Sequence, residues 1–374
     1  MRDIQLFEFD IQAAATKNSY IQEFSRCLDN GDFILGSAVA DFEQNLSSCL
    51  HIDYIQSCGN GTDALWLAFK ALGLKSGDVI ALPAFSYIAT AEIALSLDIE
   101  IIWYEINPST YNIDETIIPF LDNHPSIKAV VSVHLFGQSG NIIQLLEYCQ
   151  RRNILLIEDN AQSLGAKELS TGKYLGAIGD IGTTSFFPTK PLGCFGDGGA
   201  VFASNQNNYY LLKQLSNHGQ LKKYEHDVVG MNSRLDTIQA AILTLRLKNI
   251  DKDASIRQSI ATKYKTVLKD VEQILLPEES GYSTHVYHQY TIRVPKYRDA
   301  LREYLKEVKI PTAIHYPKVI YHQPAYKHTA PNVPLRVSEN LCKEVLSLPI
   351  HPFIDDEQIM YIASHIRQFF SNHV

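Results

Sequence analysis

Between residues 54 and 160 the chain alternates short, nearly continuous apolar runs with amphipathic segments of helical period. Such apolar runs are typical of strands buried on both faces, and the segments between them place apolar residues on one side of a helix. The alternation predicts an α/β fold with a large, mostly parallel sheet covered by helices. Ligands of such sheets bind at the carboxyl ends of the strands, so functional side chains are expected there. The expected strands lie in YIQSC, DVIALPA, IEIIWYEI, KAVVSVHLFG and NILLIEDNA.

The length of 374 residues exceeds one ordinary core and predicts two coupled domains. From about Ile250 the pattern changes to a helix, a strand in HVYHQYTIRV, a second helix, a proline-rich loop and a C-terminal helix. We therefore expect a large domain over residues 1–249 and a smaller α+β domain over residues 250–374. The helical pattern that begins at DTIQAAIL is expected to be interrupted or bent near Asp251.

Charge and composition exclude several kinds of partner. The formal net charge is -8 and no basic run occurs, which argues against nucleic acid and anionic membranes. The first residues do not have the form of a signal peptide, and no apolar run approaches the roughly 20 residues of a membrane span. The six cysteines are scattered and read as reduced thiols of a cytoplasmic protein. The 13 histidines show no metal-site spacing, so no metal is expected.

One lysine, Lys190, stands in TSFFPTKPLGCFGDGGAVF, where a strand-like run is expected to end. A glycine-rich turn and a second apolar strand follow. A lysine presented in this way can attack a carbonyl carbon and hold it as a Schiff base. A surface lysine before a β-hairpin is the ordinary alternative for this residue alone.

Three further side chains follow expected strands. Asp159 ends LLIED, where a carboxylate could hold a protonated pyridine nitrogen; capping of a helix is its alternative. Gln162, three residues later, could hydrogen-bond a ring hydroxyl. Tyr87 follows the strand that ends in LPA and could stack on a flat ring, although core packing would also explain it.

A phosphate site is the fourth expected feature. GNGTDAL places Gly61 and Thr62 at a helix start, where backbone N–H groups, a hydroxyl and the helix dipole suit an anion. Ser185 lies five residues before Lys190 and could supply a second hydroxyl. Together these features meet the requirements of pyridoxal 5'-phosphate.

The chain resembles the sugar aminotransferases of the DegT/DnrJ/EryC1/StrS family, which have the type I, aspartate aminotransferase-like fold. The resemblance covers nearly the whole chain and rests on NGTDAL, AFSYIATA, IEDNAQSLGA, SFFPTKPLGCFGDGGA, NHGQ, GMNSRLDTIQAAIL, AIHYP and LSLPIHP. It implies Lys190 as the cofactor-binding lysine and acid/base. The implied cofactor contacts are Asp159 at the ring nitrogen, Gln162 at the ring hydroxyl, Tyr87 stacking, and Gly61, Thr62 and Ser185 at the phosphate.

The same resemblance implies partners and a reaction. Asn232 would reach the phosphate site of a neighbouring subunit, which makes a homodimer necessary for catalysis. L-Glutamate would be the amino donor and a nucleotide-linked ketosugar the acceptor. Relatives that dehydrate carry His where Lys190 stands here, so transamination is expected. Glu105 stands where relatives usually carry Asp, with little expected consequence.

The substrate implied most closely is a UDP-linked 2-acetamido hexuluronic acid, aminated at C3 for O-antigen synthesis. Its implied contacts are Gly31, Phe33, Thr189, Arg234, His315 and Tyr316. Arg234 would pair with the uronate carboxylate, or serve as a structural ion pair; His315 could equally be a satisfied loop histidine. Related proteins have Tyr at the position of Phe33, which removes one hydroxyl. The alternatives are a dTDP- or UDP-linked 6-deoxy ketosugar aminated at C3 or C4, and a non-catalytic regulatory protein.

Overall fold

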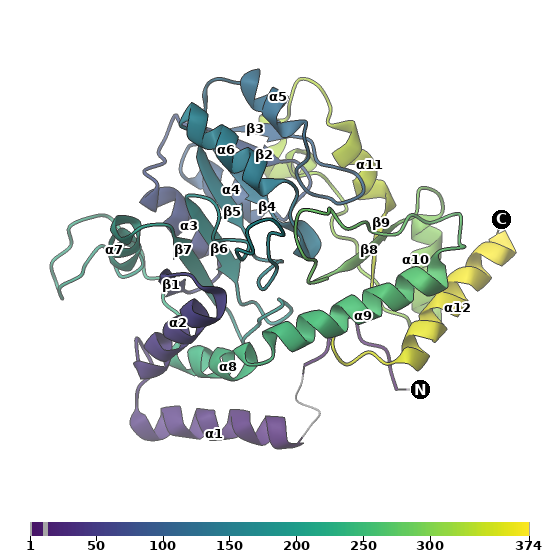
Figure 1. Cartoon of the computed structure of the whole chain (residues 1–374), viewed down its shortest axis with the longest axis horizontal. Helices are drawn as coiled ribbons and strands as arrows, with labels where there is room; N and C mark the ends of the chain where they lie inside the picture. Colours follow the sequence, from purple (N-terminus) through teal and green to yellow (C-terminus); the bar gives the residue numbers. More distant parts are fainter. Residues whose placement is uncertain (1, 10–13, 374) are drawn as a thin grey trace.

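A seven-stranded sheet forms the centre of the computed structural model, which describes residues 2–9 and 14–373 (Figure 1). The strand order is β1-β7-β6-β5-β4-β2-β3. The last five strands in this order run parallel, whereas β7 is antiparallel to both neighbours. The predicted α/β class with a mostly parallel sheet is therefore confirmed. The strands are β1 (Tyr54–Cys58), β2 (Val79–Pro83), β3 (Glu100–Tyr104), β4 (Ile127–Val133), β5 (Leu155–Asp159), β6 (Ile181–Ser185) and β7 (Gly199–Ala203).

Helices connect the strands and pack on the sheet. Local sequence sets where they begin: Asn60 and Asn141 each accept a hydrogen bond from a backbone N–H of the following helix, at 2.8 and 3.2 Å. Asn153, in a left-handed conformation, ends the second of these helices. The helices of this part are α2 (Ser37–Leu50), α3 (Gly61–Ala71), α4 (Ala89–Ser96), α5 (Ile117–Asp122), α6 (Ile142–Arg152) and α7 (Gln206–Leu215), with a 3-10 turn, η2, at Leu135–Gly137.

A break in the helical pattern after residue 247 separates α8 (Thr237–Leu247) from α9 (Ile250–Leu268). The interruption predicted near Asp251 thus falls at residues 248–249. In Figure 1, α8 lies beside α1 (Ala14–Asn30) and α2, and α9 runs from there to the second part of the molecule. That part contains β8 (Tyr290–Arg293), β9 (Val345–Leu348), α10 (Arg298–Glu307), α11 (Arg336–Glu344) and α12 (Asp356–His373), with 3-10 turns η3 (Ile320–His322) and η4 (Pro324–Thr329).

The buried apolar residues form separate clusters. Two of them surround the seven-stranded sheet, and a third lies between α9, α10, α12 and the antiparallel pair β8 and β9. This third cluster includes Ile4 from the start of the chain, and Val319 to Tyr321 pack back on the sheet. The domain boundary between residues 249 and 250 remains a proposal, supported by the helix break.

Two predicted strands are shorter in the structure. The run expected to reach Lys190 ends as a strand at Ser185, because the chain turns back at Phe187, whose carbonyl accepts the Lys190 N–H at 2.9 Å. The strand expected over HVYHQYTIRV covers only Tyr290–Arg293. Among residues 2–9 and 14–373 no helix is long and apolar enough to cross a membrane.

Candidate active site

One edge of the sheet gathers the residues predicted to bind a cofactor. The carboxyl ends of β5 and β6 lie at this edge, and β1 also ends here because it pairs with β7 in the opposite direction. Asp159 is the last residue of β5, and Ser185 is the last of β6. Residues 59–62 follow β1 and open α3. The topology thus brings segments from distant parts of the sequence to one place.

Gly61 and Ser185 form a close cradle at the start of α3. A Cβ atom on Gly61 would lie 2.7 Å from the Ser185 Cβ, which excludes any larger residue at position 61. The backbone of Gly199 passes equally close to Asn60, since its Cβ would lie 2.4 Å from the Asn60 carbonyl oxygen. The start of α3, with its free N–H groups and the Thr62 hydroxyl, therefore lies directly beside Ser185, and a helix start of this kind suits an anion.

A serine on a remote loop holds this cradle in place. Ser233 donates a hydrogen bond from its hydroxyl to Asp63 Oδ2 at 2.6 Å and accepts one from the Gly59 N–H at 2.9 Å. The two contacts join the loop before α8 to the turn that precedes α3 and to the first turn of that helix. Asn232, the neighbouring residue, is exposed and forms a backbone bridge with Asn217.

Asp159 and Lys190 shift each other's ionisation. Burial raises the pKa of Asp159, while the Ala161 N–H, the charge of Lys190 and His134 act to lower it. Burial lowers the pKa of Lys190 to about 8, against the raising effect of the Asp159 charge. Each charge is thus costly by itself and is stabilised by the other. An amine with this pKa is readily deprotonated and can serve as nucleophile and base.

A histidine and a glutamate that the sequence analysis missed lie behind Asp159. His134 Nε2 and Glu158 Oε2 are 2.8 Å apart, both side chains are fully buried, and His134 Nδ1 has no partner among the described residues. Glu158 also accepts hydrogen bonds from the N–H groups of Gly176, Ile178 and Gly179. Burial would raise the pKa of Glu158, but the bonds from His134 and the glycines hold it below its ordinary value. His134 and Glu158 lie at the ends of two predicted strands, and this position was the only feature of the sequence that could have identified them.

Gln162 is fixed at both ends of its amide. Its Oε1 accepts the Phe136 N–H at 2.8 Å, and its Nε2 donates to the Tyr316 hydroxyl at 3.0 Å. The second hydrogen on Nε2 remains for a ligand. Tyr87, 56% exposed, lies 6.1 Å from Tyr316 between ring centroids.

The residues predicted to contact the sugar fall into two groups. Gly31 and Phe33 lie on the exposed loop after α1, where the Phe33 carbonyl accepts the Thr237 N–H at 3.1 Å. This bond places the loop beside the strand-like segment that carries Arg234. No carboxylate of residues 2–9 or 14–373 pairs with Arg234, whose Nη1 reaches Asn217 Oδ1 at 3.4 Å. The structure therefore gives no support to the structural ion-pair alternative.

The second group lies nearer Lys190. His315 Nδ1 is 2.9 Å from the Ser347 hydroxyl, and burial together with the Lys190 charge lowers the pKa of His315 to about 4. Thr189 and His315 line the same small cavity. Tyr316 joins this group through its hydrogen bond with Gln162.

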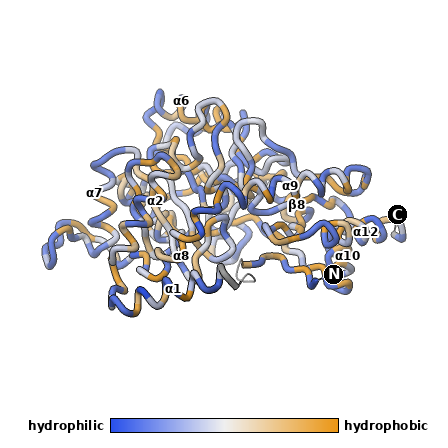
Figure 2. The backbone as a smooth tube through the Cα atoms, turned by 60° about the horizontal axis from the view of Figure 1, so that its bottom comes forward, coloured by the Kyte–Doolittle hydropathy of each residue, from blue (hydrophilic) through white to orange (hydrophobic). Residues whose placement is uncertain are grey.

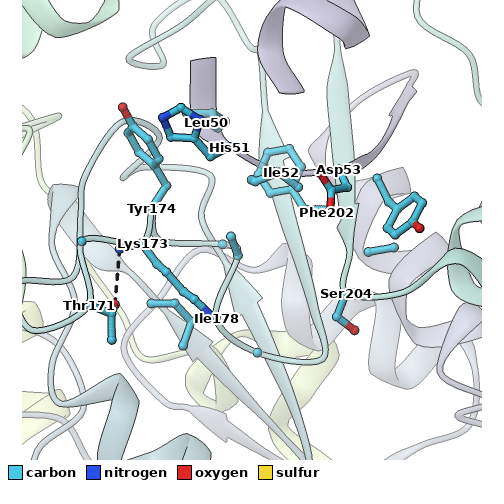
Figure 3. Close-up of a pocket in the computed structure, with 16 residues that line it drawn as sticks. Leu50, His51, Ile52, Asp53, Thr171, Lys173, Tyr174, Ile178, Phe202 and Ser204 are labelled. Atoms are coloured by element: carbon cyan, nitrogen blue, oxygen red, sulfur yellow. Dashed lines mark hydrogen bonds between the residues drawn. The ribbon is translucent and has the colours of Figure 1, made fainter. Parts of the chain in front are cut away.

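Another pocket lies at the opposite edge of the sheet (Figure 3). It has a volume of about 380 Å³ and is lined by His51, Lys173, Tyr174 and the ends of β1 and β7 remote from Lys190. None of the predicted site residues lines it, so we place the active site at the edge that holds Lys190.

The donor set at that edge fits pyridoxal 5'-phosphate. The cradle that a Cβ would fill suits a phosphate, the buried carboxylate of Asp159 suits a pyridinium, and Lys190 suits an aldehyde. Gln162 keeps a donor for a ring hydroxyl. Sequence reasoning supplied these residues, and the structure brings them together.

Known proteins resemble the chain over nearly its full length. The sequence profile of the DegT/DnrJ/EryC1/StrS aminotransferase family matches residues 14–367. The UDP-2-acetamido-2-deoxy-3-oxo-D-glucuronate aminotransferase of Pseudomonas aeruginosa is 37% identical, over 96% of this chain and 99% of its own. A pleiotropic regulatory protein of Geobacillus stearothermophilus is 33% identical, over 98% and 99%. The X-ray structure of S. venezuelae DesV in complex with a ketimine intermediate is 30% identical and covers 99% of both chains with a TM-score of 0.93.

The close approach of Gly61 and Ser185 predicts how a methyl group at position 61 affects stability and cofactor binding. Gly61→Ala should destabilise the protein by about 1–3 kcal/mol through overpacking and weaken binding of pyridoxal 5'-phosphate. Thermal unfolding and cofactor titration measure the two effects. Gly61→Ala combined with Ser185→Gly should recover the stability but not the affinity. Equal affinity of Gly61→Ala and the unaltered protein would contradict a phosphate site here.

Proposed function

This chain belongs to the DegT/DnrJ/EryC1/StrS aminotransferase family of pyridoxal 5'-phosphate enzymes, and on that premise we propose that it aminates a nucleotide-linked ketosugar. The observation that carries the proposal is the meeting of Lys190, Asp159 and the Gly61–Ser185 cradle at one sheet edge. The proposed donor is L-glutamate. The proposed acceptor is UDP-2-acetamido-2-deoxy-3-dehydro-glucuronic acid, aminated at C3 for O-antigen or other surface polysaccharide.

The residues divide the chemical work. Bound pyridoxal 5'-phosphate supplies a carbonyl that captures amino groups and a ring that withdraws electrons. Lys190 Nζ, with its lowered pKa, takes the proton from the donor's α-carbon and returns protons during the second half of the reaction. Asp159 would hold the ring nitrogen of the cofactor and keep it protonated. The His134 N–H donates to the Asp159 carbonyl at 3.0 Å, and His134 acts to lower the pKa of Asp159.

The nucleotide sugar is proposed to lie across the exposed side of the site. Gly31, Phe33 and Arg234 lie on two segments joined by backbone hydrogen bonds. The guanidinium of Arg234 contacts Asn217 but pairs with no carboxylate of the described residues, so it suits a uronate carboxylate. Thr189, His315 and Tyr316 lie toward Lys190 and suit the sugar ring. The activity named for the Pseudomonas aeruginosa relative supports this choice of substrate class.

A homodimer with shared active sites is proposed from the exposed apolar surface of α1. Ile21, Phe24 and Leu28 are 52%, 36% and 62% exposed, and with Phe195 they line a groove that is almost wholly apolar. Polar and apolar stretches alternate along α1 in Figure 2. Exposed patches of this kind mark interfaces. The loop after α1 continues the patch toward the segment that carries Asn232.

Lys190→Ala should abolish amino transfer, because the change removes the amine proposed to serve as both nucleophile and base. Turnover with L-glutamate and a ketosugar, and the absorbance of the bound cofactor, measure the loss. Lys173→Ala, in the pocket at the opposite edge, is the matched control and should leave turnover unchanged. Full turnover of Lys190→Ala would contradict the assignment and would favour a non-catalytic role.

Arg234→Ala should reduce kcat/KM for the uronate substrate by roughly 10- to 100-fold, the range expected when a charged hydrogen bond is lost. A 6-deoxy ketosugar, which has no carboxylate, should be affected little. Assays of both substrates with both proteins make the comparison. An equal loss on the two substrates would remove the support for a uronate.

Mixed dimers test whether Asn232 serves the neighbouring subunit. One protomer carries Lys190→Ala and its partner carries Asn232→Ala. If Asn232 serves the active site of the neighbouring subunit, each mixed dimer has one active site in which both residues are native. Random mixing of two inactive proteins should then restore about a quarter of the original activity. If Asn232 acts within its own chain, mixing restores nothing.

A further inference from the structure

Arg257 is a buried cation without a partner in the described part of the chain. It lies on α9, and the residue is only 5% exposed. No hydrogen bond joins its guanidinium to residues 2–9 or 14–373, and no carboxylate there lies within the 4.0 Å of an ion pair. Asp253, one turn earlier on the helix, acts on it only at longer range. Burial is the main reason that the pKa of Arg257 is lowered to about 10.

Its guanidinium lines a cavity of about 100 Å³ that also reaches the catalytic lysine's neighbour, Thr189. One water needs on the order of 10–15 Å³, so the cavity has room for a small polar group but not for a nucleotide. Leu6 and Phe7, from the first segment of the chain, form its apolar wall. The remaining lining joins Thr189, in the turn after β6, to residues 288–350 of the second part.

Other polar groups in the cavity are also without partners. His288 is 8% exposed, and its Nδ1 has no partner among the described residues; the same holds for Gln289 Oε1. Burial, with the charges of Lys190 and Arg257, keeps the pKa of His288 well below its ordinary value. The Ser347 hydroxyl, in contrast, is already bonded to Thr291 and His315. The guanidinium of Arg257 only donates, and a neutral His288 donates from one ring nitrogen, so both suit a ligand that accepts hydrogen bonds. The amide oxygen of Gln289 only accepts and is not a contact for such a ligand.

A buried charge is stable only when it is paired, and removal of a partner costs more than a well-placed pair gains. An arginine fork matches a carboxylate, which accepts two parallel hydrogen bonds. We propose that this cavity binds the α-carboxylate of the amino donor, with Arg257 as its counter-ion and with His288 as a further contact. The inference rests on the proposed aminotransferase function and adds the donor subsite to it.

The position of the cavity favours the donor over the sugar. The donor's α-carboxylate is attached to the carbon that loses its proton to Lys190, so its site must lie next to that residue. Thr189 and His315 line the cavity and meet this condition, and they face the sugar ring only after the donor has left. The charged sugar contact, Arg234, lies instead on the exposed segment beside Phe33. A carboxylate on the ketosugar is the alternative ligand of this cavity. The donor reacts in the first half-reaction and the ketosugar in the second, so kinetics measured for each substrate distinguish the two ligands.

The test is Arg257→Met in the cofactor-loaded protein, with Lys252→Met, an exposed residue of the same helix, as the matched control. Arg257→Met should raise the KM for L-glutamate about 10- to 100-fold and leave the KM for the ketosugar unchanged. Its melting temperature should not fall, because the change removes an unpaired buried charge. Arg257→Lys keeps a charge without the planar fork and should raise the KM for L-glutamate by a smaller factor. This variant tests the proposal if Arg257→Met is insoluble.

Binding of glutarate provides a readout independent of turnover. Glutarate should raise the melting temperature of the unaltered protein and of Lys252→Met, but not that of Arg257→Met. A rise in the ketosugar KM alone would assign Arg257 to the sugar's carboxylate and overturn the proposal, as would unchanged kinetics. If the unaltered protein transfers no amino group from glutamate, the proposed function fails by itself, and the glutarate shift still decides whether a carboxylate site exists.

Discussion

The mutual stabilisation of Asp159 and Lys190 is the interaction on which the site depends. Burial penalises both charges, and each lowers the cost of the other. The pair exists because parallel strands end at a common edge and place β5 and the turn after β6 side by side. Under the proposed assignment the same pair suits the cofactor, since a pyridinium would replace the lysine's charge beside Asp159 when the amine is in use.

The surroundings fix the geometry of this pair. Glu158 accepts hydrogen bonds from His134 and from three backbone N–H groups. These bonds compensate the burial of its carboxylate next to Asp159. Gln162 links Phe136 to Tyr316 and thereby joins a sheet edge to the second part of the chain. Ser233 links the loop before α8 to Gly59 and Asp63, on either side of the α3 start. Preorganisation of this kind lets a polar site act without rearrangement.

The sequence predicts well what depends on local pattern and strand order. Asp159, Gln162 and the glycines at the start of α3 follow apolar runs, and parallel topology requires that such strand ends meet. The early end of β6 was not predicted, because both phenylalanines before Pro188 fit a strand, while the turn depends on a backbone bond to Lys190. His134 and Arg257 were missed for a related reason. Their significance depends on which groups surround them in space, and those groups come from remote segments.

The most direct measurement of the central claim is to locate the lysine that holds the cofactor. The protein is loaded with pyridoxal 5'-phosphate, treated with borohydride to make the linkage permanent, digested and analysed by mass spectrometry. The account predicts that the modified peptide contains Lys190 and that no other lysine is labelled to a comparable extent. Labelling of a different lysine, or no labelling of Lys190, would contradict it.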